Sequence, residues 1–433
     1  NQFNLRVFGL LASRFSVGFR PNRVATIDDN SARDLIKGDF RNYGIEGRYL
    51  KRFTIFKKSN VALLGVRYYN GFNHSLQGLG STGKGADFKF ANAEKFTNYD
   101  YRFPNKNAAF FAENIFYLNS KLSITPGLRT EYIRTNADGF YGVILRDLTG
   151  AVDTTLRIAE TRKSQRNFLL LGIGLGYSFT STIEAYANIS ENYRSITFSD
   201  MRISNPSAEI DPNLSDEKGY SIDAGLRSKA ATVLNYDVSV FLLNYDNRIG
   251  ELQYADSNNR VVRQRTNVGR AVVSGIEGFM ELDVVHVLAR EEKKYTGAVF
   301  VNTAFTQSAY MASKIVGIEG NAIEFVPAVN TKVGFRMGYK TWQASVQYTY
   351  LSEQFSDATN AINGGVSSVV GVIPAYALAD ASLSYVYKWI KIEASINNLT
   401  DVYYFTRRAT GYPGPGILPS DGRSFYLTVQ LKL

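Results

Sequence analysis

The chain has 433 residues, 45% of them hydrophobic, and a formal net charge of +10. The longest apolar run, residues 168–179, is shorter than the about 20 residues that a membrane-spanning helix needs, so a helical membrane protein is excluded. Cysteine is absent, which excludes disulfides and thiolate chemistry and suits an oxidising compartment. No Lys/Arg run exceeds two residues, so the positive charge favours anionic lipid or an anionic ligand over nucleic acid.

Strand-like alternation of apolar and polar residues begins at the N-terminus and recurs along nearly the whole chain. Residues 332–340 and 342–350 place apolar side chains on one face and polar ones on the other, and residues 424–433 do the same at the C-terminus. We count about 16 such runs, and many exceed the modal soluble strand of about 5–6 residues. The pattern therefore predicts an all-β chain with long strands.

The links between these runs are alternately short and long. The short links are predicted at Lys51–Asn60, Leu118–Leu122, Ser178–Thr182, Arg227–Thr232, His286–Tyr295, Tyr339–Thr341 and Lys388–Ile390. The long links are predicted at Pro21–Asp39, Gly71–Lys106, Asn136–Ser164, Asn192–Glu217, Asn247–Arg270, Ala309–Phe325, Ser352–Pro374 and Thr400–Gly422. Short turns at one end and long loops at the other are typical of a transmembrane antiparallel β-barrel of the outer membrane. An immunoglobulin-type sandwich would not segregate its links in this way, and no fixed-period motif supports a propeller.

The same asymmetry gives the orientation. In bacterial barrels the short turns are periplasmic and the long loops extracellular, so the last strand runs from Arg423 at the outer rim towards Leu433 at the periplasmic face. Tyrosines near strand ends would form interfacial girdles, although strand propensity alone could also explain them. These tyrosines are Tyr68, Tyr69, Tyr339, Tyr350, Tyr385, Tyr387, Tyr403 and Tyr404.

Polar residues of both charges occupy the inward positions, which predicts a wet or polar interior rather than an apolar core. They are Glu184, Asn188, Glu277, Glu281, Asp283, Asn302, Lys332, Arg336 and Asp380. Catalysis has little support, because the two histidines, His74 in a long link and His286 in a short one, are predicted at opposite ends. Cys/His metal-ligand spacing is absent, and the glycines of residues 172–176 lie inside a strand rather than in a nucleotide-binding turn.

The long links are rich in arginine, whose guanidinium group pairs with carboxylate or phosphate in a bidentate way. Several arginines that converge on one vestibule would select a polyanionic ligand, such as a metal chelate of a hydroxy-carboxylate. Bridges to acidic lipopolysaccharide, or ion pairs within the loops, remain as alternatives for each arginine. The candidate ligand-binding residues are Arg20, Arg102, Arg194, Arg202, Arg263, Arg265, Arg407 and Arg408.

Two regions resemble the TonB-dependent outer-membrane receptor family. One is residues 398–404 (NLTDVYY) followed by Gly422–Phe425 and the alternating final strand, which is similar to the family's terminal signature. The other is residues 185–194 (AYANISENYR) leading into residues 197–200 (TFSD). Together with residues 266–269, 274–277 and 325–327, this second region is similar to the iron(III) dicitrate receptor branch.

The resemblance implies a barrel of about 22 strands, a plug domain inside it, and energy supplied by TonB through an N-terminal box. Residues 1–433 are therefore expected to be one N-terminally incomplete barrel domain whose plug lies outside this chain. The chain departs from the family in ending with Leu433 instead of phenylalanine, and residues 409–420 offer no match for the family's asparagine in the last outer loop.

The resulting hypothesis is active import of a ferric chelate, an anionic siderophore or ferric citrate, across the bacterial outer membrane. The expected partners are the TonB–ExbB–ExbD complex, the chelate itself, and outer-membrane lipid and lipopolysaccharide. No nucleic acid and no cofactor are expected. A passive porin with a charged lumen is the main alternative, because about 16 strands is also a porin-like number. A barrel enzyme would need a nucleophile, base and acid near the outer rim, where His74 alone could serve as the base.

Overall fold

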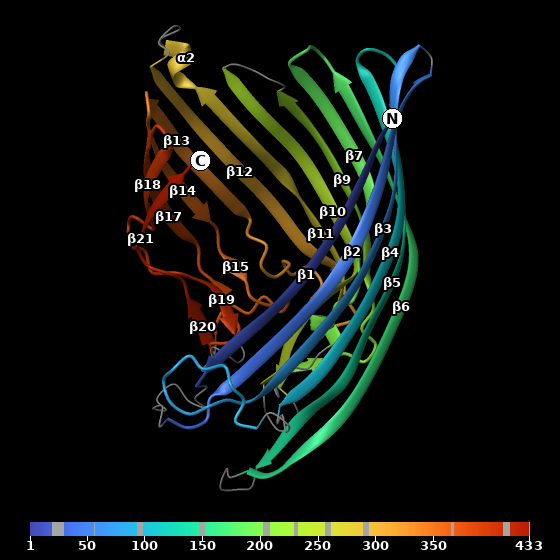
Figure 1. Ribbon diagram of the computed structural model, residues 1–433, viewed down its shortest axis with the longest axis vertical. Coiled ribbons are helices and arrows are strands. Elements are labelled where there is room, and N and C mark those ends of the chain that lie inside the picture. Colours follow the sequence, from blue (N-terminus) through green and yellow to red (C-terminus); the bar gives the residue numbers. More distant parts are fainter. Residues whose placement is uncertain are drawn as a thin grey trace.

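A computed structural model describes residues 1–19, 30–55, 57–92, 98–146, 152–201, 208–228, 233–255, 261–288, 294–364, 368–409 and 416–432. Long tilted strands form one curved sheet that wraps around an interior (Figure 1). The described residues include two short helices, α1 (Phe198–Met201) and α2 (Val284–Leu288). Neither helix is long or apolar enough to span a membrane.

The main sheet has 17 strands, of which all but β8 (Ala208–Ile210) form an antiparallel meander in chain order. The meander strands are β1 (Gln2–Gly18), β2 (Asp34–Ile55), β3 (Lys58–Leu79), β4 (Tyr99–Tyr117), β5 (Leu122–Arg146), β6 (Val152–Ser178), β7 (Ile183–Arg194), β9 (Glu217–Ser228), β10 (Leu234–Ala255), β11 (Val261–Asp283), β12 (Tyr295–Ala312), β13 (Val329–Tyr339), β14 (Trp342–Leu351), β17 (Tyr376–Tyr387), β18 (Ile390–Asn397) and β21 (Ser424–Leu431). Two outer links contain small hairpins, β15 (Gln354–Phe355) with β16 (Val372–Ile373) and β19 (Phe405–Ala409) with β20 (Gly416–Pro419). The predicted all-β antiparallel architecture is confirmed.

The two kinds of link gather at opposite ends of the sheet (Figure 1). Each predicted short link lies where two consecutive strands are joined, and α2 lies between β11 and β12, while residues 56, 229–232 and 289–293 of these links fall outside the described residues. Three predicted long links are wrong in part, because strands continue through much of them: β3 and β4, β5 and β6, and β10 and β11 remain paired well beyond the predicted ends. His74 therefore lies in β3 rather than in a loop. Most of these extensions have polar residues on both faces, which weakens the alternation that marks a strand with one face in lipid, although Tyr99, Tyr101 and Phe103 of β4 still alternate with polar residues.

One face of the sheet carries large exposed apolar side chains, as expected for a surface in lipid. Leu169, Leu171 and Ile173 alternate along β6 and are 54%, 52% and 43% exposed. The opposite face carries the predicted polar set, often in pairs. Arg227 binds Glu184 at 2.8 Å, and Arg336 forms an ion pair with Glu281.

A repeated arrangement of glycine, aromatic ring and ion pair lines the inner face. At each site an aromatic ring covers a glycine on the neighbouring strand, where a Cβ atom would clash with the ring. An arginine stacks on that ring at 5.1–5.5 Å and also pairs with a glutamate. The four sets are Phe8, Gly44, Arg67 and Glu46; Phe111, Gly65, Arg129 and Glu131; Tyr186, Gly225, Arg227 and Glu184; and Phe300, Gly334, Arg336 and Glu281.

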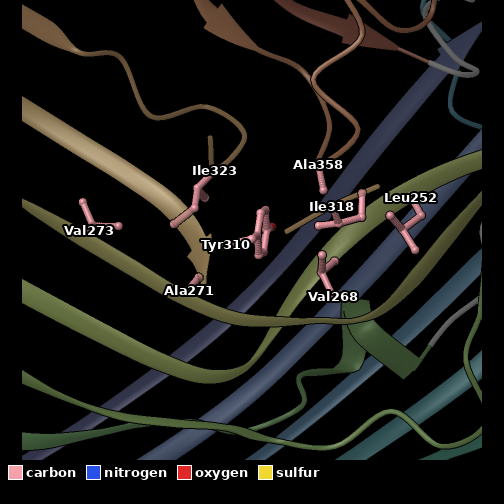
Figure 2. Packing of buried hydrophobic residues seen from close by; sticks show 8 residues of the cluster. All are labelled: Leu252, Val268, Ala271, Val273, Tyr310, Ile318, Ile323 and Ala358. Carbon is pink, nitrogen blue, oxygen red and sulfur yellow. The ribbon is translucent and has the colours of Figure 1, made fainter. Parts of the chain in front are cut away.

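Two outer links, residues 313–328 and the described residues of 352–375, pack against the long-link ends of β10–β12 and form a small apolar core. Ile318 and Ile323 from the first link and Ala358 from the second lie against Val268 and Tyr310 (Figure 2). All five side chains are almost fully buried. The long-link ends of β10–β12 are therefore covered by these two packed links.

Candidate functional site

The link between β7 and β9 also turns back onto the wall and forms the centre of the candidate site. It contains α1, at whose start the Asp200 carboxylate reaches back to Thr197, as the acidic residue does in one half of a capping box. The backbone N–H and the hydroxyl of Thr197 both donate to Oδ2 of Asp200, at 2.9 and 2.8 Å. Further along, β8 pairs in parallel with Arg263–Arg265 of β11.

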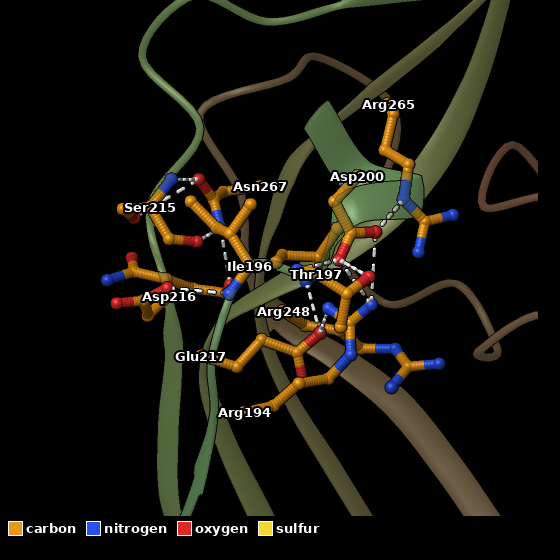
Figure 3. Close-up of polar contacts among 12 residues, drawn as sticks. Arg194, Ile196, Thr197, Asp200, Ser215, Asp216, Glu217, Arg248, Arg265 and Asn267 are labelled. Carbon is orange, nitrogen blue, oxygen red and sulfur yellow. Dashed lines mark hydrogen bonds and ion pairs between the residues drawn. The ribbon is translucent and has the colours of Figure 1, made fainter. Parts of the chain in front are cut away.

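Asp200 is fully buried and receives two arginines from different strands (Figure 3). Nε of Arg265, on β11, lies 2.5 Å from Oδ1, and Nη2 of Arg194, on β7, lies 3.1 Å from Oδ2. Burial acts to raise the pKa of Asp200, but the hydrogen bond from Thr197 and the charges of Arg265 and Arg194 outweigh it and hold the pKa below its ordinary value. Asp200 is therefore a charged anchor for the inward-turned link.

Both arginines hold a second carboxylate. Nη1 of Arg194 lies 3.0 Å from Glu217, which also accepts the backbone N–H of Ile249 at 2.8 Å. Nη1 of Arg265 lies 3.1 Å from Glu251. An anion that binds these guanidinium groups would therefore have to displace a protein carboxylate, because neither arginine is unpaired.

The other end of the α1 segment is held by apolar packing. Met201 is 4% exposed and lies among Tyr99, Tyr101 and Phe103 of β4. Asp200 contacts Arg265 of β11, whereas its neighbour Met201 packs against β4. The link between β7 and β9 therefore contacts two separate parts of the sheet, β11 and β4.

A second buried charge cluster lies beside the first. Asp216 accepts Nε of Arg166 at 2.6 Å, the backbone N–H of Ile196 at 2.7 Å, and the hydroxyl of Tyr193. Arg166 is 8% exposed, and its two terminal nitrogens have no acceptor among the described residues. Sequence reasoning missed both residues: Arg166 lies inside the long strand β6, and Asp216 lies in the link just before β9, and no local pattern distinguishes either from the other charges of the chain.

A third cluster sits over the small apolar core. The hydroxyl of Tyr310 donates to Glu324 at 2.7 Å, and Arg248 lies 3.8 Å from the same carboxylate. Burial raises the pKa of Glu324 above its ordinary value, although Arg248 and Tyr310 oppose that shift. This cluster fixes the link of residues 313–328 against the wall.

The remaining predicted arginines are scattered. Arg408 donates to the carbonyls of Ser368 and Val372 at 2.9 and 2.6 Å, so it ties two outer links together. Arg407 is exposed on β19. Arg102 lines a hollow of about 270 Å³ with Asp100, Asp138 and Arg157. Arg263 lies in β11, and Arg20 and Arg202 fall outside the described residues.

Of the predicted set, the structure thus brings Arg194 and Arg265 together. His74 contacts Asp100 at 2.7 Å, whereas His286 lies in α2 at the opposite end of the wall. No group of three metal-ligating side chains occurs within the described ranges.

Comparison with known proteins now gives the family. The sequence model of the TonB dependent receptor-like β-barrel matches residues 2–399. The chain belongs to this family. It therefore supplies barrel strands of a bacterial outer-membrane receptor, and the family is one of receptors rather than enzymes. Comparison with curated protein sequences yields no match.

Several solved structures of transporters and uptake receptors share the fold at low sequence identity. The ferric citrate transporter FecA is similar over 99% of this chain with a TM-score of 0.72 and 19% identity, and 59% of its own length is covered. The copper transporter OprC gives a TM-score of 0.72 at 15% identity, with 99% of this chain and 62% of OprC covered. The ferric yersiniabactin receptor FyuA from Yersinia pestis gives 0.69 at 14% identity, with 99% and 58% covered. This TonB-dependent receptor chain thus spans about three fifths of such proteins, and the family resemblance seen in the sequence is confirmed.

Proposed function

We propose that this chain is the main part of the barrel of an active importer that takes up a ferric chelate, either an anionic siderophore or ferric citrate. The observation that carries the proposal is the convergence of Arg194 and Arg265 on Asp200 at the outer end of the wall. Guanidinium groups held in this way match ligand carboxylates, and Glu217 and Glu251 are the protein groups that a ligand would displace. Three of the similar structures are receptors for ferric citrate, ferric yersiniabactin and ferric catecholates, which supports an iron cargo.

The transport step is proposed to need parts beyond this chain. Residues 1–433 are taken as one barrel domain that further strands and a plug complete. Among the described residues β1 pairs with β2 and β21 with β18, and no pairing joins β1 to β21, so both edges offer unpaired backbone groups. Open edges cannot persist in lipid, which supports additional strands between them. Energy is proposed to come from the TonB–ExbB–ExbD complex through an N-terminal segment. Iron enters as cargo within the chelate, and no resident cofactor is proposed.

The test compares two arginines of the same full-length gene product. Arg265→Gln removes a guanidinium from the convergent site, and Arg102→Gln removes one from the opposite, outward face of the wall. We expect Arg265→Gln to weaken binding of ferric citrate or a carboxylate siderophore at least tenfold, the loss of one charge-assisted contact, and Arg102→Gln to leave it unchanged. Binding is measured by isothermal titration calorimetry, and uptake with radioactive iron in cells that have or lack TonB.

Two results would contradict the proposal. If the two variants bound the ferric chelate equally well, the site formed by Arg194, Arg265 and Asp200 would have no role in ligand recognition. A large stable conductance of the full-length protein in a planar bilayer, together with uptake that does not need TonB, would favour the passive porin.

A further inference from the structure

The β5–β6 hairpin extends beyond β7 at the long-link end of the sheet (Figure 1). Strands β5 and β6 stay paired without a register shift from Leu122–Tyr177 to Leu145–Thr154, whereas β7 pairs with β6 only between Gly172 and Ser178. Beyond Gly172, β6 therefore has β5 as a neighbour on one side and an edge on the other.

The direction of the backbone groups shows which residues form this edge. Ser178 donates its N–H at 2.8 Å to Lys121, just before β5, and Leu171 donates its N–H at 2.9 Å to Glu191 of β7. The N–H and C=O of one strand residue point to the same side, and those of the next residue point to the other. Since the register does not shift, the odd-numbered residues from 155 to 165 direct both groups away from β5. They are Thr155, Arg157, Ala159, Thr161, Lys163 and Gln165.

This edge is unpaired in the described part of the chain. No strand other than β5 pairs with these six residues, and no described loop forms a backbone hydrogen bond with them. All six are exposed. The described residues of the link between β7 and β9 turn inward instead, where they contact Arg265 of β11 and pack against β4. Strands that complete the barrel would join β1 and β21, so they would not cover this edge either.

The edge stands clear of the lipid. Leu169 belongs to the exposed apolar rows, and Arg157 lies twelve residues beyond it on the same strand. At about 3.3 Å per residue and a tilt of about 40°, Arg157 is about 30 Å above Leu169. The polar interface of a bilayer is only about 5–7 Å deep on each side of the hydrocarbon. The edge is therefore open to soluble protein outside the cell.

The edge also lacks most of the features that keep edge strands from pairing with another chain, such as proline or a bulge. Residues 155–165 contain neither proline nor glycine, and their register with β5 is regular. Arg157 and Lys163 are the charged members of the six, and neither forms an ion pair with a described carboxylate. Arg157 is held over Phe140, with 3.4 Å between Cζ and the ring centroid. A straight edge with two such cations attracts an acidic strand and repels a basic one.

We propose that residues 155–165 of β6 are a docking edge for an extended acidic segment of another protein outside the cell, which adds to the sheet as an antiparallel strand. The six edge residues supply the backbone hydrogen bonds of this strand addition. Segment residues opposite Arg157 and Lys163 carry carboxylates. Those opposite Leu156 and Ile158 are apolar, because these two side chains are 48% and 38% exposed on the other face of the hairpin. The docking edge is independent of the ligand proposed for import.

The probe is a synthetic peptide designed to pair antiparallel with residues 155–165. It has glutamate opposite Arg157 and Lys163, valine opposite Leu156 and Ile158, and threonine elsewhere. Binding of the fluorescently labelled peptide to the purified full-length protein in detergent is measured by anisotropy. Two N-methylated versions separate strand pairing from charge attraction, since one is methylated on two amides that face β6 and the other on two amides that face away.

Methylation of the amides that face β6 is expected to weaken binding about tenfold or more, because two hydrogen bonds are lost, and methylation of the other amides should change it by less than about twofold. Replacing both glutamates of the peptide by lysine should weaken binding about tenfold, and the variant Arg157→Glu/Lys163→Glu should reverse this preference. The matched control Lys51→Glu/Arg52→Glu changes two exposed cations at the short-turn end and should keep the preference of the wild type.

A second pair of variants tests the edge on the receptor side. Ala159→Pro removes one edge N–H at a position where an edge strand tolerates proline, so binding should weaken about fivefold. Ala159→Val keeps the N–H and should bind as the wild type does. Heat-modified migration on gels checks that each variant folds, and the two methylated peptides decide the matter on the wild type if Ala159→Pro does not fold.

Three results overturn the proposal. Equal binding of the two methylated peptides overturns strand addition, and equal binding of the glutamate and lysine peptides overturns the acidic partner. A dimer of the wild type that Ala159→Pro dissociates would make a second copy of this chain the occupant of the edge. Uptake of a ferric chelate is read separately, so the docking edge and the import proposal can fail independently.

Discussion

Asp200→Asn is the most informative single substitution at the outer end of the barrel. It keeps the shape of the side chain but removes the charge that Arg265 and Arg194 share at 2.5 and 3.1 Å. Breaking a fully buried ion pair costs about 3–5 kcal/mol. Both guanidinium groups here are about one-third exposed and keep a second carboxylate, so a cost of about 2 kcal/mol is expected.

This loss of free energy applies to the docking of the α1 segment onto the sheet. It does not apply to the sheet itself, because backbone hydrogen bonds between neighbouring strands hold the strands together. Amide hydrogen exchange in residues 194–201 should therefore accelerate about thirtyfold, while β5 and β6 stay unchanged. Glu319→Gln is the control, since its side chain is exposed and forms no hydrogen bond or ion pair among the described residues. If exchange in residues 194–201 were unchanged in Asp200→Asn, the carboxylate would not anchor the segment and the reasoning would be refuted.

Three further outcomes are expected. The pKa of Asp200 is lowered in the folded state, so its contribution to docking is complete above about pH 4 and is lost as the pH falls through the lowered pKa. Amide exchange in residues 194–201, corrected for intrinsic rates, should therefore rise only in that acidic range. Gly65→Ala would place a Cβ against the ring of Phe111, so the barrel should lose about 1–3 kcal/mol of unfolding free energy, measured by urea titration in detergent. Tyr310→Phe removes the hydroxyl that donates to buried Glu324, so opening of residues 313–328 should become easier by about 1–3 kcal/mol, measured by hydrogen exchange.

Each of these outcomes has a matched control. Asp200→Asn should abolish the acid-dependent rise, and its persistence would assign the effect to another carboxylate. Gly85→Ala should be neutral, because no heavy atom lies within 4 Å of the added Cβ, and an equal loss there would show that glycine flexibility matters more than the ring contact. Tyr403→Phe alters a side chain that is 92% exposed and should leave exchange in residues 313–328 as it is.

The amino-acid sequence alone was sufficient to predict the membrane-spanning wall. Residues 342–350 were predicted as one strand, and β14 covers Trp342–Leu351. The same holds for β13 and β21, where one face meets lipid and the other the interior. Alternation is a local consequence of this two-sided environment, so it can be read from neighbouring residues. In the extended β5–β6 hairpin polar residues occur on both faces, so the regular alternation is lost and the sequence predicted a loop.

Only the tertiary structure decided which charges meet. Eight arginines were equal candidates in the sequence, and no local signal separated Arg265, which shares a buried carboxylate, from Arg102, which faces the lipid side. Asp200 and Arg265 are 65 residues apart and meet because β8 aligns with β11 and the link between β7 and β9 turns inward. Likewise, Lys106 and Arg134 become neighbours only through the register of β4 and β5. An ion pair depends on distances between strands, and those distances are set by register and loop packing rather than by the residues on either side.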